Sequence, residues 1–255
     1  MAQNYQVIEG AEEFAFGEGP VGALLVHGFT GSPQGLRALG EHLAAQGIAI
    51  SGPRLPGHGT AWEDLGARRS EEWIETTAAA YEALEARVDE VFLVGLSFGA
   101  ALCLDLAARR PDEISGVVAL SPFVMSKDPR RFLAPVIRLL VQSIPGVGND
   151  IADPEMREIV YDRVPVRAAG SMLQFTGKVR AELENVTSPL LIIHSRNDHT
   201  AHPDNAEVIH RSVSSGDKRI EWLERSYHVI TIDYDRDRVA ELTTEFIKDR
   251  AKHAL

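Results

Sequence analysis

The serine at position 97 stands in a pattern that supports nucleophilic chemistry. Residues 95–99 read Gly-Leu-Ser-Phe-Gly, after the apolar run 91–94 and before small residues with helical spacing at 100–108. A serine at so tight a turn adopts strained backbone angles, which requires small neighbours such as Gly95 and Gly99. The pattern therefore predicts a nucleophile elbow that lifts Ser97 Oγ above a sheet edge, with the Phe98 N–H facing a developing oxyanion.

A serine hydroxyl is a poor nucleophile at neutral pH, so it needs a base and an acid that fixes the tautomer of the base. With such an elbow the chain order is nucleophile, acid, base. His228 follows the last predicted strand and is the expected base; Asp198 follows the strand before and is the expected acid. Asp204 is the alternative acid, although Pro203 before it predicts a helix start, where aspartate caps the first turn.

A glycine-containing loop follows the first apolar strand and is expected to complete an oxyanion hole. It reads His27-Gly28-Phe29-Thr30-Gly31. Glycines let a backbone approach a ligand closely, so the Phe29 N–H is expected to pair with the Phe98 N–H. One such donor contributes about 3 to 4 kcal/mol in a comparable site. His27 is interpreted as a structural loop residue, not as the base.

Neither a metal nor a redox role is predicted. His199 and His202 border Asp198, but no second carboxylate or histidine pair at helical spacing accompanies them, so they are interpreted as polar loop residues. Cys103, the single cysteine, excludes an intramolecular disulfide and is expected to be a small buried core residue.

Composition indicates a globular domain whose substrate is neutral or apolar. The chain has 255 residues, 44% hydrophobic and 25% charged, with a formal net charge of −11. That charge disfavours nucleic acid and anionic membrane surfaces, which carry the same sign. The first apolar stretch, 22–26, is too short for a signal or a span, so the expectation is a cytoplasmic protein without a stable membrane anchor.

Short apolar runs alternate with helix-length segments over one predicted domain, 1–255. This alternation predicts a mostly parallel α/β sheet with helices on both faces and a site at the carboxyl ends of the strands. The predicted strands lie near 21–26, 48–51, 91–94, 116–120, 190–194 and 219–223, and the helices near 33–46, 71–87, 98–109, 204–213 and 236–250.

The stretch 123–186 interrupts this alternation and is predicted to be an inserted helical cap, because about 65 residues pass without a convincing strand. Its first helix, over 132–141, is apolar nearly all round. Two interpretations remain open: the helix packs on the core, or it lines an acyl pocket. The substrate-binding residues expected in the second case are Phe29, Phe98, Ile137, Leu140, Ile151 and Val229.

With these residues in place, the chain resembles the α/β-hydrolases, and within them the bacterial carboxylesterases and monoacylglycerol lipases. The resemblance rests on 25–33, 53–60, the elbow and 228–233, and it extends to the lid at 150–155 and 161–165. It implies ester hydrolysis through an acyl-enzyme, without metal or organic cofactor, on short to medium acyl esters or monoacylglycerols. Phe98 and Ala100 depart from the smaller residues that relatives often carry in the elbow.

Two alternatives remain at this level. The same triad could act on an amide, a thioester or a carbon–carbon bond, or the chain could be a ligand-binding protein that keeps the fold without turnover. Epoxide hydrolases and dehalogenases are disfavoured because they would need a carboxylate in place of Ser97. The residues do not specify an oligomeric state.

Overall fold

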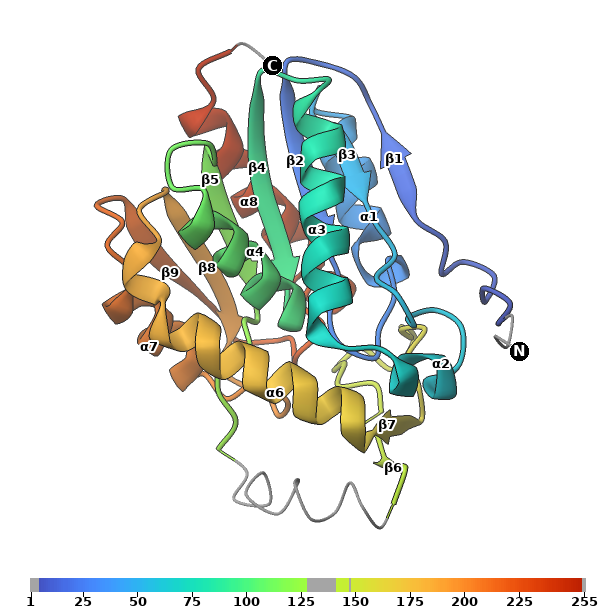
Figure 1. The fold of residues 1–255 in the computed structure, drawn as a ribbon. Helices are drawn as coiled ribbons and strands as arrows, with labels where there is room; N and C mark the ends of the chain where they lie inside the picture. The colour runs from blue at the N-terminus through green and yellow to red at the C-terminus, as the bar shows by residue number, and fades with distance from the viewer. Residues whose placement is uncertain (1–4, 128–140, 147, 254–255) are drawn as a thin grey trace.

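A seven-stranded sheet forms the centre of the molecule in the computed structural model, which describes residues 5–127, 141–146 and 148–253 (Figure 1). Its strand order is β1-β3-β2-β4-β5-β8-β9, and every pairing is parallel except that of β1 with β3. The strands are β1 (Phe14–Phe16), β2 (Val21–Val26), β3 (Ala49–Gly52), β4 (Glu90–Leu96), β5 (Gly116–Leu120), β8 (Leu190–Ser195) and β9 (Lys218–Leu223).

All six predicted strands are confirmed, and β1 is an addition. Every residue of β2, β4, β5 and β8 is buried, which explains why their apolar runs do not alternate with polar residues. β1 has three residues, too few to produce a recognisable pattern. It pairs antiparallel with the edge strand β3.

Helices cover both faces of the sheet, as predicted. On one face, α3 (Ser70–Glu85), α4 (Phe98–Arg109) and α7 (Asp204–Ser212) contribute to one hydrophobic cluster. On the other face, α1 (Gln34–Ala44) and α8 (Arg236–Arg250) contribute to a second cluster. A short helix, α2 (Trp62–Ala67), was not predicted, because six residues carry too little periodicity.

The helix after the elbow is deeply buried, which accounts for its small residues. In α4 every residue from Phe98 to Ala107 is buried. Cys103 lies among them, as expected, and burial raises the pKa of its thiol. The thiolate form needed for reactivity is therefore disfavoured.

The insertion between β5 and β8 contains a long helix, as expected of a helical cap, but the expectation that it contains no strand was wrong. β6 (Ser143–Pro145) and β7 (Arg163–Pro165) form an antiparallel ribbon, and α6 (Val166–Ala181) and a 3₁₀ turn (Leu183–Asn185) follow. Each strand has three residues and ends in proline. A proline in the sequence disfavours the prediction of a strand, although an edge strand tolerates it. The apolar helix predicted over 132–141, with Ile137 and Leu140, lies outside the described residues, apart from its last residue.

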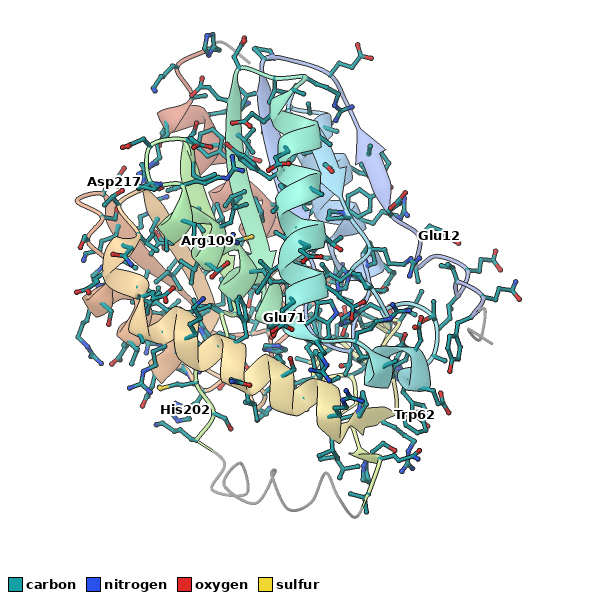
Figure 2. The ribbon with its side chains drawn as sticks, viewed as in Figure 1. Glu12, Trp62, Glu71, Arg109, His202 and Asp217 are labelled. Atoms are coloured by element: carbon teal, nitrogen blue, oxygen red, sulfur yellow. The ribbon has the colours of Figure 1, made fainter. Side chains whose placement is uncertain are left out.

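Helix α6 crosses the end of the molecule at which β4 leads into α4, and it contacts α2, α3 and α4 (Figure 1). The Ser70 backbone N–H at the start of α3 donates to Ser171 Oγ in α6 over 3.0 Å. Figure 2 labels Trp62 of α2. The guanidinium of Arg163 in β7 lies 5.6 Å from the centre of the Trp62 ring. Within the described part of the chain, no helix combines the length and the apolar character needed to cross a bilayer.

Candidate active site

Ser97 occupies a strained turn between β4 and α4. Its backbone angles are φ 56° and ψ −114°, outside the regions that non-glycine residues favour. Two hydrogen bonds join this turn to the end of β5 and the loop after it: the Ser97 N–H donates to Leu120 O over 2.8 Å, and the Phe123 N–H donates to Ser97 O over 3.2 Å. The elbow is therefore fixed by the end of the neighbouring strand β5.

The two glycines of the elbow are required by close backbone contacts. A Cβ on Gly99 would lie 2.0 Å from the carbonyl oxygen of Val26, and a Cβ on Gly95 would lie 2.5 Å from Ala100 Cα. Neither neighbour is a flexible side chain that could move aside. The physical reason for the Gly-x-Ser-x-Gly spacing is thus the packing of α4 against β2 and β4.

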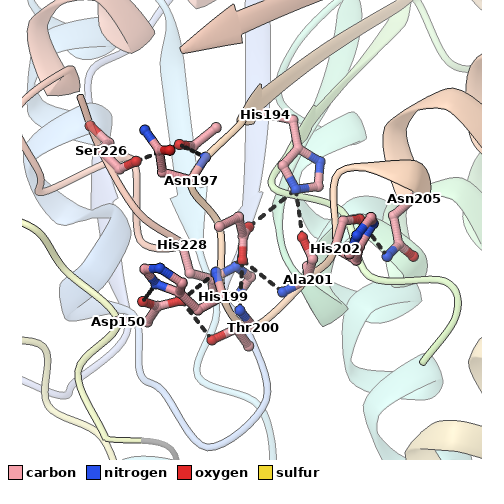
Figure 3. A network of polar contacts seen from close by, with 12 residues as sticks. Asp150, His194, Asn197, His199, Thr200, Ala201, His202, Asn205, Ser226 and His228 are labelled. Atoms are coloured by element: carbon pink, nitrogen blue, oxygen red, sulfur yellow. Dashed lines mark hydrogen bonds and ion pairs between the residues drawn. The ribbon is translucent and has the colours of Figure 1, made fainter. Parts of the chain in front are cut away.

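The loops after β8 and β9 bring Asp198 and His228 together. Figure 3 shows His228 beside Thr200 and Ala201 of the loop after β8. His228 Nδ1 lies 2.8 Å from Asp198 Oδ2, and the Asp198 side chain is fully buried. The other carboxylate oxygen, Oδ1, accepts from the N–H groups of Thr200 and Ala201 over 2.9 and 2.7 Å. Because a carboxylate accepts, Nδ1 of His228 carries the hydrogen, which leaves Nε2 to accept a proton.

The electrostatics suit an ionised acid beside a general base. Burial alone would raise the pKa of Asp198, but the charge of His228 and hydrogen bonds from His194 and His228 hold it well below its usual range. Burial lowers the pKa of His228, but the charge and hydrogen bond of Asp198, with Asp150 and Glu158, raise it above its ordinary value. The surroundings therefore favour an ionised Asp198 beside an imidazole whose pKa is raised.

Asp204, the alternative acid, points elsewhere. It lies at the start of α7, where its carboxylate pairs with Lys127 Nζ and lies 3.0 Å from His202 Nδ1. His199 Nδ1 lies 2.9 Å from a carboxylate oxygen of Asp150. Over the described ranges, no group of three or more His, Cys, Asp or Glu side chains is arranged to hold a metal ion.

The loop after β2 lies directly against the elbow. A Cβ on Gly28 would lie 3.3 Å from Ser97 Cβ, so the loop backbone approaches the serine closely. As the first residue of α4, Phe98 has a backbone N–H without an acceptor in a preceding helical turn. Thr30 in the loop has a positive φ of 66°, which is uncommon for a residue other than glycine.

His27 anchors this loop. Its Nδ1 donates to Gly28 O over 2.9 Å, and its Nε2 accepts from the Leu55 N–H over 3.1 Å. Burial lowers the pKa of His27 to about 4, so the ring is neutral at working pH. Both ring nitrogens are used within the fold, which agrees with the structural role expected for this residue.

The side chains of Phe29 and Phe98 belong to an aromatic cluster. The Phe98 ring centre lies 6.0 Å from Phe29, 5.4 Å from Trp73 and 5.9 Å from Phe175, which is part of α6. Phe98 is only 1% exposed, whereas Phe29 is half-buried. Of the pair, only Phe29 therefore keeps exposed surface.

The two other expected pocket residues within the described ranges pack toward the α1 and α8 face. Val229 is a buried member of that core cluster, and Ile151 is half-buried against it. Their positions place them near the base loop, because the Val229 N–H donates to Asp150 O over 3.3 Å.

Two carboxylates that connect the cap to the loops after β8 and β9 were not predicted. Asp150 accepts from the His199 N–H and from Thr200 Oγ1 over 3.1 and 2.9 Å, and its backbone carbonyl accepts from the His228 N–H over 3.0 Å. It therefore joins the acid loop to the base loop. The pairing spans 50 residues of sequence and leaves no local signal.

Asp233 is the second of these carboxylates, and it is fully buried. Its oxygens accept four backbone N–H groups at 2.7 to 3.0 Å, two from the cap and two from the base loop, namely those of Ala152, Asp153, Tyr227 and Tyr234. A carboxylate that collects this many donors fixes both segments relative to each other.

Glu158 is a further cap residue that sequence reasoning missed. Its Oε1 lies 2.5 Å from where a Cβ on Gly31 would stand and 3.2 Å from the same position on Gly35. Burial raises the pKa of Glu158 to about 7, with His228 acting in the opposite direction. A carboxyl near half-ionisation at neutral pH thus faces the loop beside Ser97.

Comparison with known proteins defines the family. The model of the family described as serine aminopeptidase, S33, matches residues 22–235, and the chain therefore belongs to this α/β-hydrolase family. Among curated relatives, a thermostable monoacylglycerol lipase of Bacillus sp. (strain H-257) is 37% identical, with all of both chains covered. A carboxylesterase of Bacillus subtilis (strain 168) is 29% identical, covering 92% of this chain and 95% of that protein.

Solved structures agree with this assignment. A structure from work on LipS and LipT, two metagenome-derived lipolytic enzymes, is 35% identical with a TM-score of 0.93, covering 96% of this chain and all of that one. The monoacylglycerol lipase of Paleococcus ferrophilus, at 23% identity, shares the fold with a TM-score of 0.81, covering 94% and 98% of the two chains.

Proposed function

We propose that this protein is a serine hydrolase that cleaves carboxylic esters of short to medium acyl chains or monoacylglycerols. The observation that carries the proposal is the buried Asp198–His228 pair, 2.8 Å apart, at the strand ends where the strained Ser97 elbow and the glycine loop meet. A base held in one tautomer by an ionised acid is what an unactivated serine requires.

The reaction follows from these groups. Ser97 Oγ attacks the ester carbonyl while His228 Nε2 takes its proton, and the Phe29 and Phe98 N–H groups stabilise the resulting oxyanion. The C–O bond to the alcohol breaks, the imidazolium returns its proton to that alcohol, and an acyl-Ser97 ester remains. Water then repeats the sequence through His228, which releases the acid and restores Ser97. Asp198 remains ionised throughout.

The substrate class is supported by two independent facts. Full-length relatives at 37% and 29% identity are a monoacylglycerol lipase and a carboxylesterase. The formal net charge of −11 favours a neutral substrate over an anionic one. An amide substrate is the second candidate, because the matching family model is described as a serine aminopeptidase.

The test is a substrate panel on the purified chain. We expect p-nitrophenyl esters and monoacylglycerols of matched acyl length to be hydrolysed, and aminoacyl p-nitroanilides to be turned over far more slowly. Ser97→Ala should lose several orders of magnitude in kcat while it folds like the wild type. A fluorophosphonate probe should label the wild type and not the variant.

The outcomes separate the candidates. Faster turnover of the anilides than of the esters would support an amide substrate. A wild-type chain that neither labels nor turns over any substrate would refute catalysis altogether and leave a ligand-binding protein. A Ser97→Ala variant that retained a tenth of kcat would show that another residue is the nucleophile.

A further inference from the structure

A second histidine touches the carboxylate of the triad. His194 is fully buried in β8, and its Nε2 lies 3.1 Å from Asp198 Oδ2 and 2.8 Å from Ala201 O (Figure 3). Its other nitrogen, Nδ1, is buried without a hydrogen-bond partner among the described residues. Because both oxygens accept, the ring hydrogen sits on Nε2.

We propose that His194 is a positioning residue of the active site, whose single Nε2–H is shared between Ala201 O and Asp198 Oδ2 and sets how strongly Asp198 holds His228. This inference rests on the proposed function, because it assigns a role within the same triad. His194 does not touch the reacting atoms; it acts through Asp198.

The hydrogen-bond count around Asp198 supports this role. Oδ1 already accepts the N–H groups of Thr200 and Ala201, and Oδ2 faces two imidazoles, one from β8 and one from the loop after β9. A carboxylate shared among four donors is a weaker acceptor toward each of them. His194 therefore weakens the hold of Asp198 on protonated His228 while it keeps the carboxylate in place.

The chemistry of the site argues against a purely packing role. The ring lies 6.1 Å from the ring centre of Trp222, an environment in which an aliphatic side chain would also pack. Retaining an imidazole there leaves Nδ1 buried and unsatisfied, which is unfavourable. The hydrogen bonds that the Nε2–H group makes to Ala201 O and Asp198 Oδ2 offset this cost.

The consequence is a defined shift in the pH dependence. The charged groups that face His228 are Asp198, Asp150 and Glu158. Removing the His194 donor leaves Asp198 a stronger partner for the His228 imidazolium, so the pKa of His228 rises. Catalysis requires neutral His228. As the pH is lowered, the variant therefore loses activity at a higher pH than the wild type does.

Two substitutions separate this role from a structural one. His194→Met removes the donor at similar volume, whereas His194→Gln places an amide nitrogen near the position of Nε2. In His194→Met, we expect the acid limb of the pH profile of kcat/KM for a p-nitrophenyl ester to move to higher pH by about half a unit. At a fixed pH on that limb, kcat/KM should then be about threefold lower than in the wild type. His194→Gln should keep the wild-type limb.

A stability-matched control and a second readout complete the design. Val118→Ala, in the buried strand β5, should lower the melting temperature without moving the acid limb. The pKa of His228 can be measured by NMR titration without turnover. It should shift in the same direction as the acid limb of kcat/KM. Should His194→Met not fold, His194→Asn replaces it, because its shorter amide does not reach Asp198.

An unchanged acid limb and an unchanged His228 titration in the donor-free variant would overturn the proposal and leave His194 as an anchor for Ala201 alone. A wild-type chain without esterase activity or probe labelling would instead refute the proposed function. In that case the NMR titration still decides whether His194 controls the His228–Asp198 pair.

Discussion

At the scale of single residues, the geometry distinguishes two aspartates that follow the same strand. Asp198 and Asp204 are six positions apart, yet only Asp198 meets His228, because the turn through Thr200 and Ala201 wraps around its carboxylate. Asp204 begins α7 and pairs with Lys127 and His202 on the surface.

This difference predicts opposite outcomes for the two amide substitutions. Asp198→Asn preserves shape but presents a donor to His228 Nδ1, which favours the wrong imidazole tautomer, and kcat should fall by about 10⁴, as in a comparable triad. Asp204→Asn loses only exposed ion pairs, which contribute little, and should leave kcat unchanged. Steady-state kinetics on one ester measures both, and the reverse result would transfer the acid role to Asp204.

Glu158 leads to a pH prediction with a definite sign. Its pKa is raised to about 7, so above that pH the carboxylate is charged and helps to raise the pKa of His228. Glu158→Gln removes this charge, and the acid limb of kcat/KM should move to lower pH. Glu155→Gln, an exposed cap substitution, is the matched control.

The same shift makes a stability prediction. A carboxyl whose folded pKa is raised stabilises the fold fully below its unfolded pKa, and that stabilisation is lost as pH rises through about 7. The melting temperature of Glu158→Gln relative to the wild type should therefore increase between about pH 4.5 and 7 and then level off. A constant difference across that range would contradict the raised pKa.

At the scale of elements, the elbow depends on how closely α4 packs against β2. Gly99→Ala would place a Cβ 2.0 Å from Val26 O, a backbone atom that cannot move without disturbing the sheet. We expect this variant to be insoluble or to unfold at a much lower temperature. Gly170→Ala in α6 is the matched control, because its new Cβ would have no neighbour within 4 Å apart from the adjacent residues and the backbone of its own helix.

The control has its own expected value. Alanine is favoured over glycine in a helix interior by about 0.5 to 1 kcal/mol, so Gly170→Ala should raise stability by that amount. Thermal denaturation of both variants gives the comparison. A stable, active Gly99→Ala protein would show that α4 can shift away from β2, which the elbow geometry excludes.

At the scale of the whole molecule, Asp233 connects the cap to the catalytic loops. Its carboxylate accepts backbone N–H groups from residues 152 and 153 and from residues 227 and 234. Asp233→Asn turns an NH₂ group toward some of these donors, and each unsatisfied N–H costs about 1 to 3 kcal/mol. We expect a loss of stability of about 2 kcal/mol or more.

The measurement that identifies this connection is hydrogen exchange. In Asp233→Asn, exchange should become faster in 150–153 and in 227–234 together, because one side chain holds both segments. Asp217→Asn, which loses an exposed ion pair with Arg250, should change neither. Faster exchange in only one of the two segments would show that Asp233 does not couple the cap to the base loop.

The sequence by itself determined the features whose cause is local. Long apolar runs predicted β2, β4, β5 and β8, because strands buried on both faces leave no polar positions. The elbow was recognisable because its strain and close contacts require glycine at two fixed positions, Gly95 and Gly99. The strands β1, β6 and β7 were missed because three residues carry no periodicity and two of the strands contain proline.

Only the tertiary structure decided how distant segments meet. Asp150 joins loops that lie about 50 and 80 residues further along the chain, and Glu158 faces a loop that precedes it by more than 100 residues. His194 touches Asp198 because the chain turns back on itself after β8, an arrangement that apolar spacing does not encode. Hydrogen bonds and burial between such partners depend on three-dimensional distance, whereas the sequence records only order and composition.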